Sequence, residues 1–242
     1  MGRLDGKIAI VTGASQGIGL GIAEGLAAEG ASLVLTARNI ERLNQNAETL
    51  AQSGVNVLAI RADVTDEAQV QEVFRQTLER FGRLDLLVNN AGIFDGGPVD
   101  ELSVEVWDRV MATNLRGPFL CTREAMRIMK PQRSGRIINI GSISAQRVRP
   151  NSAAYSTSKH GLWGLTQVTA LEGRDYGITC GCLHPGNVDV ETLADARKAN
   201  QEPVMRPEDI AQAAVAMAML PPNVNMLEAI VLPIRQPYLG RG

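Results

Sequence analysis

Short apolar runs alternate along the chain with longer segments in which apolar residues recur at the spacing of an amphipathic helix. The apolar runs predict strands at residues 8–12, 33–36, 55–60, 84–89, 136–140, 178–183 and 229–232. The amphipathic segments predict helices at residues 17–29, 40–52, 66–81, 104–130, 153–176 and 207–220. Strands that are apolar throughout are typical of a sheet covered on both faces, and their alternation with helices favours parallel pairing.

These elements predict an α/β fold, a single-domain, Rossmann-type, doubly wound parallel sheet of about seven strands with helices on both faces. The length of 242 residues suits one domain over residues 1–242, and no internal repeat or linker-like segment divides it. In such sheets ligands bind beyond the carboxyl ends of the strands. Candidate site residues are therefore expected directly after the strands.

The composition is that of an ordinary globular protein, with 45% hydrophobic and 21% charged residues. A formal net charge of −2 gives no reason to expect nucleic acid or an anionic membrane as a partner. No run approaches the roughly 18 apolar residues of a membrane span and the first residues do not resemble a signal peptide, so a reducing cytoplasm is the expected compartment. Cys180 and Cys182 are expected to pack within a strand, and no metal site is predicted.

A glycine-rich turn follows the first predicted strand and leads into a helix. Glycine allows a sharp turn and a close approach of phosphate, and the helix N-terminus offers free N–H groups. The spacing Gly-x-x-x-Gly-x-Gly is a variant of the dinucleotide-binding pattern; an ordinary strand–helix turn is the alternative. The predicted cofactor contacts in this turn are Gly13, Ser15, Gln16, Gly17, Ile18 and Gly19.

The second predicted strand is followed by Ala37-Arg38. An acidic residue at this point would bind the adenosine ribose of NAD, whereas an arginine accommodates the 2′-phosphate of NADP. Arg38 therefore predicts a preference for NADP(H) over NAD(H). The alternative is a solvated charge at a strand end.

Tyr155 and Lys159 are four residues apart and share one face of the predicted helix 153–176. A nearby ammonium favours the phenolate form of a tyrosine, so the pair can give and take a proton; an exposed helix pair is the alternative. Ser142 follows the fifth strand, where its hydroxyl can bind a developing alkoxide. Asn114 lies inside an amphipathic helix, either as a satisfied structural amide or as part of a proton relay.

Together these motifs resemble the short-chain dehydrogenase/reductase family, and its 3-oxoacyl-ACP reductase-like members in particular. The resemblance implies that Tyr155 exchanges a proton with the substrate oxygen, that Lys159 supports Tyr155 and holds the nicotinamide ribose, and that Ser142 binds the substrate oxygen. It implies that Asn114 helps to hold a water-linked proton relay. The motifs that carry the resemblance are residues 12–19, Asp63-Val64, 89–92, Asn114, Ser142, Tyr155-x-x-x-Lys159 and Pro185-Gly186.

The resemblance also implies further cofactor contacts. Asp63 would contact the adenine, Asn90 the ribose side and Val188 the carboxamide end of the cofactor. The remaining expected contacts are Val64, Ala91, Gly92, Pro185 and Gly186.

The chain departs from the family pattern in the loop after the sixth strand. His184 stands where asparagine is common, and Val190 stands where a threonine usually touches the pyrophosphate side of the cofactor. Thr192 is the candidate replacement for that contact. His184 and His160 are interpreted as structural residues.

Two further segments bear on the substrate. The predicted lid, residues 187–202, is short and polar, which favours an open pocket, with Phe94, Ser144 and Arg147 as candidate lining residues. The tail, residues 233–242, is interpreted as an extended arm docked on a surface, such as that of a neighbouring subunit, or as a frayed terminus.

The predicted function is an NADP(H)-dependent oxidoreductase that interconverts a small-molecule carbonyl compound and a secondary alcohol. The family resemblance implies that it works as a homodimer or homotetramer. One alternative is an NAD-dependent alcohol dehydrogenase, which Arg38 disfavours. The other is a non-catalytic cofactor sensor or scaffold, because a fold alone does not determine function. A binding module has no need of the set formed by Asn114, Ser142, Tyr155 and Lys159, which favours the enzyme.

Overall fold

The computed structural model describes residues 2–190 and 203–238. Within them, seven strands form one parallel sheet in the order β3-β2-β1-β4-β5-β6-β7. The order reverses between β1 and β4, which confirms the doubly wound architecture. The strands are β1 (Ile8–Thr12), β2 (Ser32–Ala37), β3 (Val57–Arg61), β4 (Leu86–Asn89), β5 (Gly135–Ile140), β6 (Ile178–Pro185) and β7 (Glu228–Val231).

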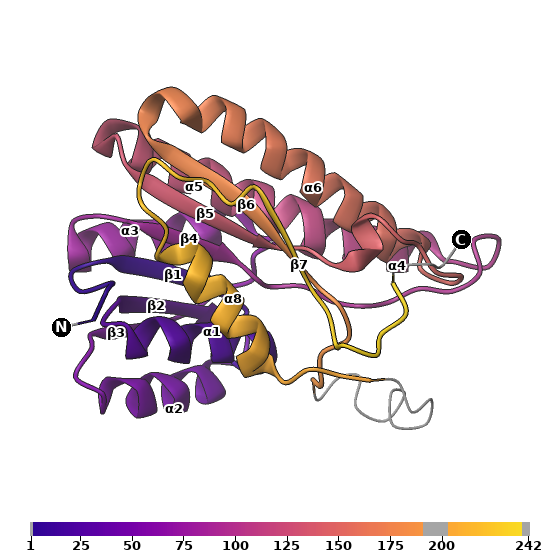
Figure 1. Cartoon of the computed structure of the whole chain (residues 1–242), viewed down its shortest axis with the longest axis horizontal. Coiled ribbons are helices and arrows are strands. Elements are labelled where there is room, and N and C mark those ends of the chain that lie inside the picture. Colours follow the sequence, from indigo (N-terminus) through magenta and orange to yellow (C-terminus); the bar gives the residue numbers. More distant parts are fainter. Residues whose placement is uncertain (1, 191–202, 239–242) are drawn as a thin grey trace.

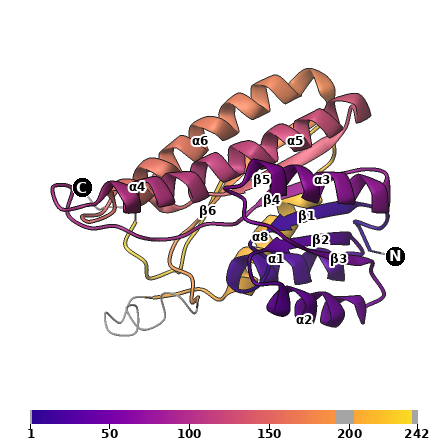
Figure 2. The same ribbon diagram turned by 180° about the vertical axis from the view of Figure 1, so that it is seen from behind.

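Helices cover both faces of the sheet (Figures 1 and 2). On one face lie α1 (Gly17–Ala28), α2 (Ile40–Ala51) and α8 (Pro207–Ala218). On the other lie α3 (Glu67–Phe81), α5 (Gly117–Gln132) and α6 (Ala153–Gly173), with α4 (Val104–Met111) packed beside α6. None of the helices within the described residues is long and apolar enough to cross a membrane.

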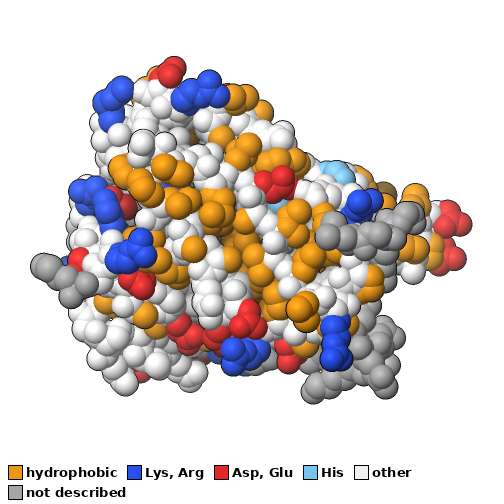
Figure 3. All heavy atoms as spheres, viewed as in Figure 1, with side chains coloured by type: hydrophobic (Ala, Val, Ile, Leu, Met, Phe, Trp, Pro, Cys, Tyr) orange, Lys and Arg blue, Asp and Glu red, His pale blue; other side chains and the backbone are white. Residues whose placement is uncertain are grey.

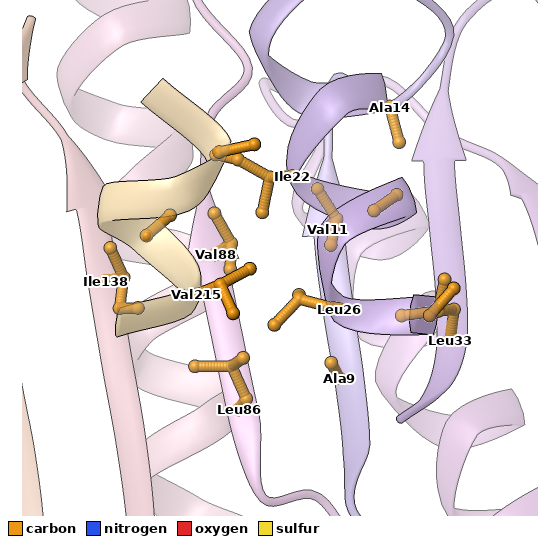
Figure 4. Close-up of a cluster of buried hydrophobic side chains, with 14 of the residues drawn as sticks. Ala9, Val11, Ala14, Ile22, Leu26, Leu33, Leu86, Val88, Ile138 and Val215 are labelled. Atoms are coloured by element: carbon orange, nitrogen blue, oxygen red, sulfur yellow. The ribbon is translucent and has the colours of Figure 1, made fainter. Parts of the chain in front are cut away.

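The strands divide their side chains between two hydrophobic cores. Successive side chains of a strand point to opposite faces, so Ala9 and Val11 of β1 pack toward α1 and α8, whereas Ile10 packs toward α3 and α5. Figure 4 shows the first core, where Leu26 of α1 and Val215 of α8 meet the apolar side chains of the strands. Both cores explain why the strands are apolar throughout in the sequence.

A buried polar network ties the sheet to the second helical layer. Asn89 Nδ2 donates to Asn139 Oδ1 on β5 at 2.8 Å and to Thr122 Oγ1 on α5 at 3.1 Å. Asn139 Nδ2 in turn donates to Thr166 Oγ1 on α6 at 2.8 Å. Because Asn89 and Asn139 face each other in the β4–β5 register, the network holds both strands and both helices directly beneath the edge that carries the candidate site.

The helix predicted at residues 104–130 is interrupted, so the expectation of one continuous helix is wrong. The chain forms α4, then a π-helical turn η1 (Ala112–Arg116), then α5. Pro118 lies near the start of α5 and has no N–H to donate to the carbonyl of Asn114 four residues earlier, which disfavours regular α-helical bonding here. The interruption falls on a predicted site residue, as π-turns frequently do.

Candidate active site

A cavity of about 740 Å³ lies at the carboxyl ends of the strands, where the strand order reverses. Segments that follow β1 to β6 line it, as the doubly wound topology predicts. Gly19, Asn114 and Arg147 are the predicted site residues that do not line the cavity. The predicted residues that do line it are Gly13, Ser15, Gln16, Gly17, Ile18, Arg38, Asp63, Val64, Asn90, Ala91, Gly92, Phe94, Ser142, Ser144, Tyr155, Lys159, Pro185, Gly186 and Val188.

The glycine-rich turn forms one end of the cavity. Gly13 and Gly17 have φ of 67° and 58°, in the left-handed region that favours glycine. A Cβ at Gly19 would lie 2.3 Å from Asn90 Nδ2 and 2.4 Å from Gly13 O, so no side chain fits there. Gln16 begins α1 without a capping hydrogen bond from its side chain, which leaves the first N–H groups of the helix available to an anion.

Three polar residues hold this turn in place. Asn90 Nδ2 donates to the carbonyls of Thr12 and Gly13 at 2.9 and 3.2 Å, and Thr12 Oγ1 accepts from the N–H of Asn90 at 3.0 Å. Asn46 Nδ2 on α2 donates to the carbonyls of Ala14 and Ser15 at 3.2 and 3.0 Å. Thr12 begins the motif at residues 12–19, whereas no local pattern in the sequence shows that Asn46 reaches the turn.

The segments after β2 and β3 form the next part of the wall. Arg38 is exposed at the cavity and has no ion pair within the described residues. Asp63 Oδ1 accepts from the N–H and the hydroxyl of Thr65, at 2.9 and 2.8 Å, and so shapes its own loop beside Val64. Asn39, next to Arg38, caps α2 by accepting from the N–H of Arg42 at 2.9 Å.

Tyr155 and Lys159 lie at the opposite end, on α6. Lys159 is 5% exposed, its Nζ lies 5.7 Å from the centroid of the Tyr155 ring, and it donates to the carbonyl of Ile140 at 2.8 Å. The Phe94 ring packs edge-on against Tyr155, with centroids 5.0 Å apart. The Tyr155 hydroxyl makes no hydrogen bond within the described residues, which leaves the phenol free to bind a ligand in the cavity.

Ser142 lines the same end of the cavity, directly after β5. Its Oγ accepts from the N–H of Ser144 at 3.1 Å, as the cap of a short 3₁₀ turn η2 (Ile143–Ala145). That bond uses the oxygen as an acceptor, so the hydroxyl proton stays available for a ligand oxygen.

Asn114 lies behind this end rather than in its wall. Its Oδ1 accepts from the N–H of Ile93 at 2.8 Å, and its Nδ2 donates to the carbonyl of Ile93 at 2.9 Å and to Ser158 Oγ at 3.2 Å. The side chain is therefore committed to holding the loop after β4 against α6. Pro118, four residues later, has no N–H to donate to the carbonyl of Asn114.

The sequence profile described as short chain dehydrogenase matches residues 7–201. The chain belongs to the short-chain dehydrogenase family. An uncharacterised oxidoreductase of Bacillus subtilis, YxjF, is 40% identical over 201 residues, which cover 81% of this chain and 78% of that protein. A 3beta-hydroxysteroid dehydrogenase of Mediterraneibacter gnavus is 38% identical over 190 residues, 78% of this chain and 68% of that one.

A solved structure extends the likeness to the whole fold. A metagenomic short-chain oxidoreductase, in complex with NADP, is 32% identical, has a TM-score of 0.84, and covers 96% of this chain and 98% of its own. This chain is thus an oxidoreductase with the fold that the sequence analysis predicts.

One of the residues predicted to line the substrate end of the cavity does not line it. Arg147 does not line the cavity; its guanidinium lies over the Tyr238 ring, 5.8 Å from the centroid. Arg149 lines the cavity instead, two residues further along the same loop. Of the predicted lid, residues 187–190 are described, and Thr192 lies outside the described residues.

Val190 stands beside the glycine-rich turn. A Cβ at Gly17 would lie 3.3 Å from Val190 Cγ1, so an apolar contact occupies the place where the family usually has a threonine.

The three cysteines are free and buried. Burial raises the pKa of the Cys182 thiol to about 12 and that of Cys121 to about 12. Cys180 and Cys182 lie in β6, as predicted. No cluster of three or more metal-ligating side chains occurs among the described residues.

His184 is fully buried at the end of β6, behind Ser142. Its Nδ1 lies 2.8 Å from the carbonyl oxygen of Ser142 and 3.3 Å from its nitrogen, and Nε2 lies 3.5 Å from Glu228 Oε1 on β7. Burial lowers the pKa of His184 below 6.5, against the opposing effects of the Ser142 carbonyl and the Glu228 carboxylate. His160, by contrast, is exposed, and its Nδ1 lies 2.9 Å from the carbonyl of Ser156.

The lowered pKa of His184 predicts a loss of stability in mild acid. As the pH falls below 6.5, the unfolded chain gains a proton on His184 that the folded protein resists, so the free energy of unfolding decreases. Urea unfolding at pH values on either side of 6.5 measures this loss. His184→Asn removes the titrating group and is expected to lose less stability than the wild type over the same interval. Parallel pH profiles for the two proteins would contradict the prediction.

Proposed function

We propose that this protein is an NADP(H)-dependent oxidoreductase that interconverts a carbonyl compound and a secondary alcohol, with Tyr155 as the general acid and base. One observation carries the proposal. The Tyr155 phenol, the Ser142 hydroxyl and the Lys159 ammonium line one end of a cavity whose wall continues to the glycine-rich turn and Arg38.

The residues present fit a dinucleotide. The glycine-rich turn leaves no room for a side chain at Gly19 and presents the start of α1 to an anion, as a pyrophosphate requires. Arg38 supports a 2′-phosphate, since it is an exposed cation at the cavity without an ion pair in the described part of the chain. The NADP in the related metagenomic oxidoreductase agrees with this choice. When bound, the reduced cofactor supplies the hydride.

Side chains of the protein protonate the oxygen of the substrate and stabilise its charge. In the reductive direction Tyr155 donates its proton to the carbonyl oxygen, which becomes the hydroxyl of the alcohol. Ser142 donates a hydrogen bond to the same oxygen and so stabilises the charge that develops on it. Lys159 holds an ammonium near the phenol and compensates the phenolate that remains. Asn114 positions the loop after β4 against α6, and its carbonyl can hold a water for proton resupply.

The test is a turnover assay with purified protein, NADPH or NADH, and a panel of ketones, aldehydes and β-keto esters. The absorbance of the reduced nicotinamide is expected to fall with NADPH in a substrate-dependent way. Turnover with NADH alone would instead support an NAD-dependent alcohol dehydrogenase. Tight NADPH binding without turnover of any carbonyl compound in the panel would support the sensor or scaffold.

Arg38→Ala is expected to weaken NADPH binding far more than NADH binding. The guanidinium can pair with the 2′-phosphate, which NADH lacks, and one such charge-assisted contact is worth about 1.5–3 kcal/mol, or roughly ten- to a hundredfold in affinity. Fluorescence titration of both cofactors measures the effect. Arg61→Ala is the matched control, because Arg61 is also exposed near a strand end but does not line the cavity. Equal losses for both cofactors would refute the assignment.

We also propose that residues 1–242 act as one catalytic unit within a homodimer or homotetramer. Two apolar surfaces support this assembly. One lies on α5 and α6, and the other lies at the unpaired edge of the sheet, where Figure 3 shows hydrophobic side chains gathered over the face that carries β7 and α8. The exposed apolar residues are Phe119, Val168 and Leu171 on the first surface and Val224, Leu227 and Ile230 on the second.

A further inference from the structure

A chain of polar contacts joins the C-terminal arm, defined here as residues 233–238, to the backbone of Ser142. The Tyr238 hydroxyl donates to Gln146 Oε1, and Gln146 Nε2 donates to Glu228 Oε1. The same carboxylate oxygen lies 3.5 Å from His184 Nε2, and His184 Nδ1 contacts Ser142. The arm therefore docks on its own chain, with Tyr238 only 9% exposed.

A second contact anchors the arm beside the first. Gln236 is 7% exposed, and its Oε1 accepts from the N–H of Asn187 at 2.8 Å, in the loop after β6. Asn187 and its neighbours line the cavity. The arm thus contacts both the loop after β5, at Gln146, and the loop after β6, at Asn187.

The neutral His184 ring can carry its proton on either of its two nitrogens, while its neighbours fix the place of the ring. The Trp163 ring packs edge-on against the imidazole, with centroids 5.7 Å apart, and a Cβ at Gly141 would lie 2.6 Å from Nδ1. The ring therefore packs against Trp163 and directly over Gly141, where no side chain would fit. A neutral imidazole carries its proton on either Nδ1 or Nε2, and the neighbours of each nitrogen decide which.

The neighbours of the two nitrogens differ. Nδ1 lies between the N–H and the carbonyl of Ser142, so it can accept from the first or donate to the second, but not both. Nε2 is buried and makes no hydrogen bond among the described residues. The Glu228 carboxylate, which only accepts, faces it with Oε1 at 3.5 Å. The contact of Nδ1 with the carbonyl oxygen, at 2.8 Å, is shorter than its contact with the N–H, at 3.3 Å, and by itself favours a proton on Nδ1. The Glu228 carboxylate acts in the opposite direction, because a proton on Nε2 suits it and Nδ1 then accepts from the N–H of Ser142.

We propose that His184 is a positioning residue for Ser142, and that Glu228, held by Gln146 and Tyr238, selects its tautomer. With the proton on Nε2, the ring holds the Ser142 N–H; with the proton on Nδ1, it would pull on the Ser142 carbonyl instead. The two choices turn the peptide groups on either side of Ser142 and so move its hydroxyl. This inference rests on the proposed function for its effect on catalysis, but the tautomer itself does not.

Nitrogen-15 NMR of the imidazole rings reads the tautomer directly. The chain has two histidines, and His160→Gln assigns the remaining signals to His184. We expect the Nε2-protonated form in the wild type. We expect the Nδ1-protonated form in Glu228→Gln, because the carboxamide that replaces the carboxylate can donate to Nε2. The Nδ1-protonated form in the wild type, or an unchanged tautomer in Glu228→Gln, would overturn the proposal.

Steady-state kinetics test the consequence for Ser142. Glu228→Gln is expected to lower kcat about tenfold while KM and the NADPH Kd stay within about twofold, since the change misplaces a group that acts on the developing oxyanion. Tyr238→Phe is also expected to lower kcat, by a smaller factor than Glu228→Gln. Because both act through His184, the double variant is expected to be no slower than Glu228→Gln alone. Tyr176→Phe is the control, as this tyrosine packs against Lys130 and Arg133 far along the chain from the site loops.

The outcomes separate the two proposals. A wild-type protein that reduces no carbonyl compound contradicts the proposed function, while the NMR result still decides the tautomer. A tautomer that switches in Glu228→Gln without any change in kcat overturns the positioning role and leaves the proposed function intact. Strictly additive effects of Glu228→Gln and Tyr238→Phe would overturn the part assigned to the arm.

Discussion

Replacing Tyr155 with phenylalanine is expected to lower kcat at least about 10²-fold, because the substrate oxygen loses its proton donor. The change removes one hydroxyl that makes no hydrogen bond within the described residues, and the remaining ring can still pack on Phe94 at 5.0 Å. Folding and NADPH affinity should therefore stay close to those of the wild type. Turnover in the reductive direction, together with a fluorescence titration of NADPH, measures both expectations.

The control for this variant is Tyr176→Phe, which makes the same change on the short 3₁₀ turn η3 (Arg174–Tyr176), outside the cavity. It is expected to keep wild-type turnover. A near-normal kcat in the Tyr155→Phe enzyme would show that Tyr155 is not the proton donor of the reaction. A large loss of NADPH affinity in that variant would instead mean that the hydroxyl serves the cofactor.

The second large effect is expected at Gly19. In Gly19→Ala the new Cβ would lie 2.3 Å from Asn90 Nδ2 and 2.4 Å from Gly13 O, and the second contact is with backbone that can move only if the turn opens. Overpacking of this kind costs about 1–3 kcal/mol. The same turn is proposed to bind the pyrophosphate of the cofactor. The Kd for NADPH is therefore expected to rise at least about tenfold in this variant.

Gly164→Ala is the matched control, because Gly164 lies within α6 and a Cβ there would meet nothing within 4 Å. The same exchange in a helix interior is expected to be neutral or to stabilise the protein by up to about 1 kcal/mol. Isothermal titration with NADPH and thermal unfolding of both variants separate binding from stability. Unchanged NADPH affinity in Gly19→Ala would contradict the role assigned to the turn.

The sheet and most helices could be predicted from the sequence because their signals are local. Apolar runs such as residues 8–12 lie where β1 forms, and helix starts such as Pro207, with its acidic first turn, are marked by residues that suit a helix N-terminus. The candidate site was predictable for the same reason. Its residues follow the strands directly, and parallel strands bring their carboxyl ends to one edge.

What could not be predicted depends on contacts between segments distant in the chain. The saturated side chain of Asn114 requires the backbone of Ile93 and the hydroxyl of Ser158, and neither pairing has a sequence signal. The π-turn at residues 112–116 is preceded by no distinct sequence signal, because a proline such as Pro118 is common in the first turn of an uninterrupted helix.

The amide network beneath the site also bears on how the sheet assembles. Asn89 and Asn139 match only in the observed alignment of β4 with β5, and a shift by one residue would turn each amide to the opposite face. Each buried amide left without a partner costs about 1–3 kcal/mol. The two asparagines therefore penalise misaligned intermediates during folding, and the chain reaches the pairing that aligns the loops carrying Asn90 and Ser142.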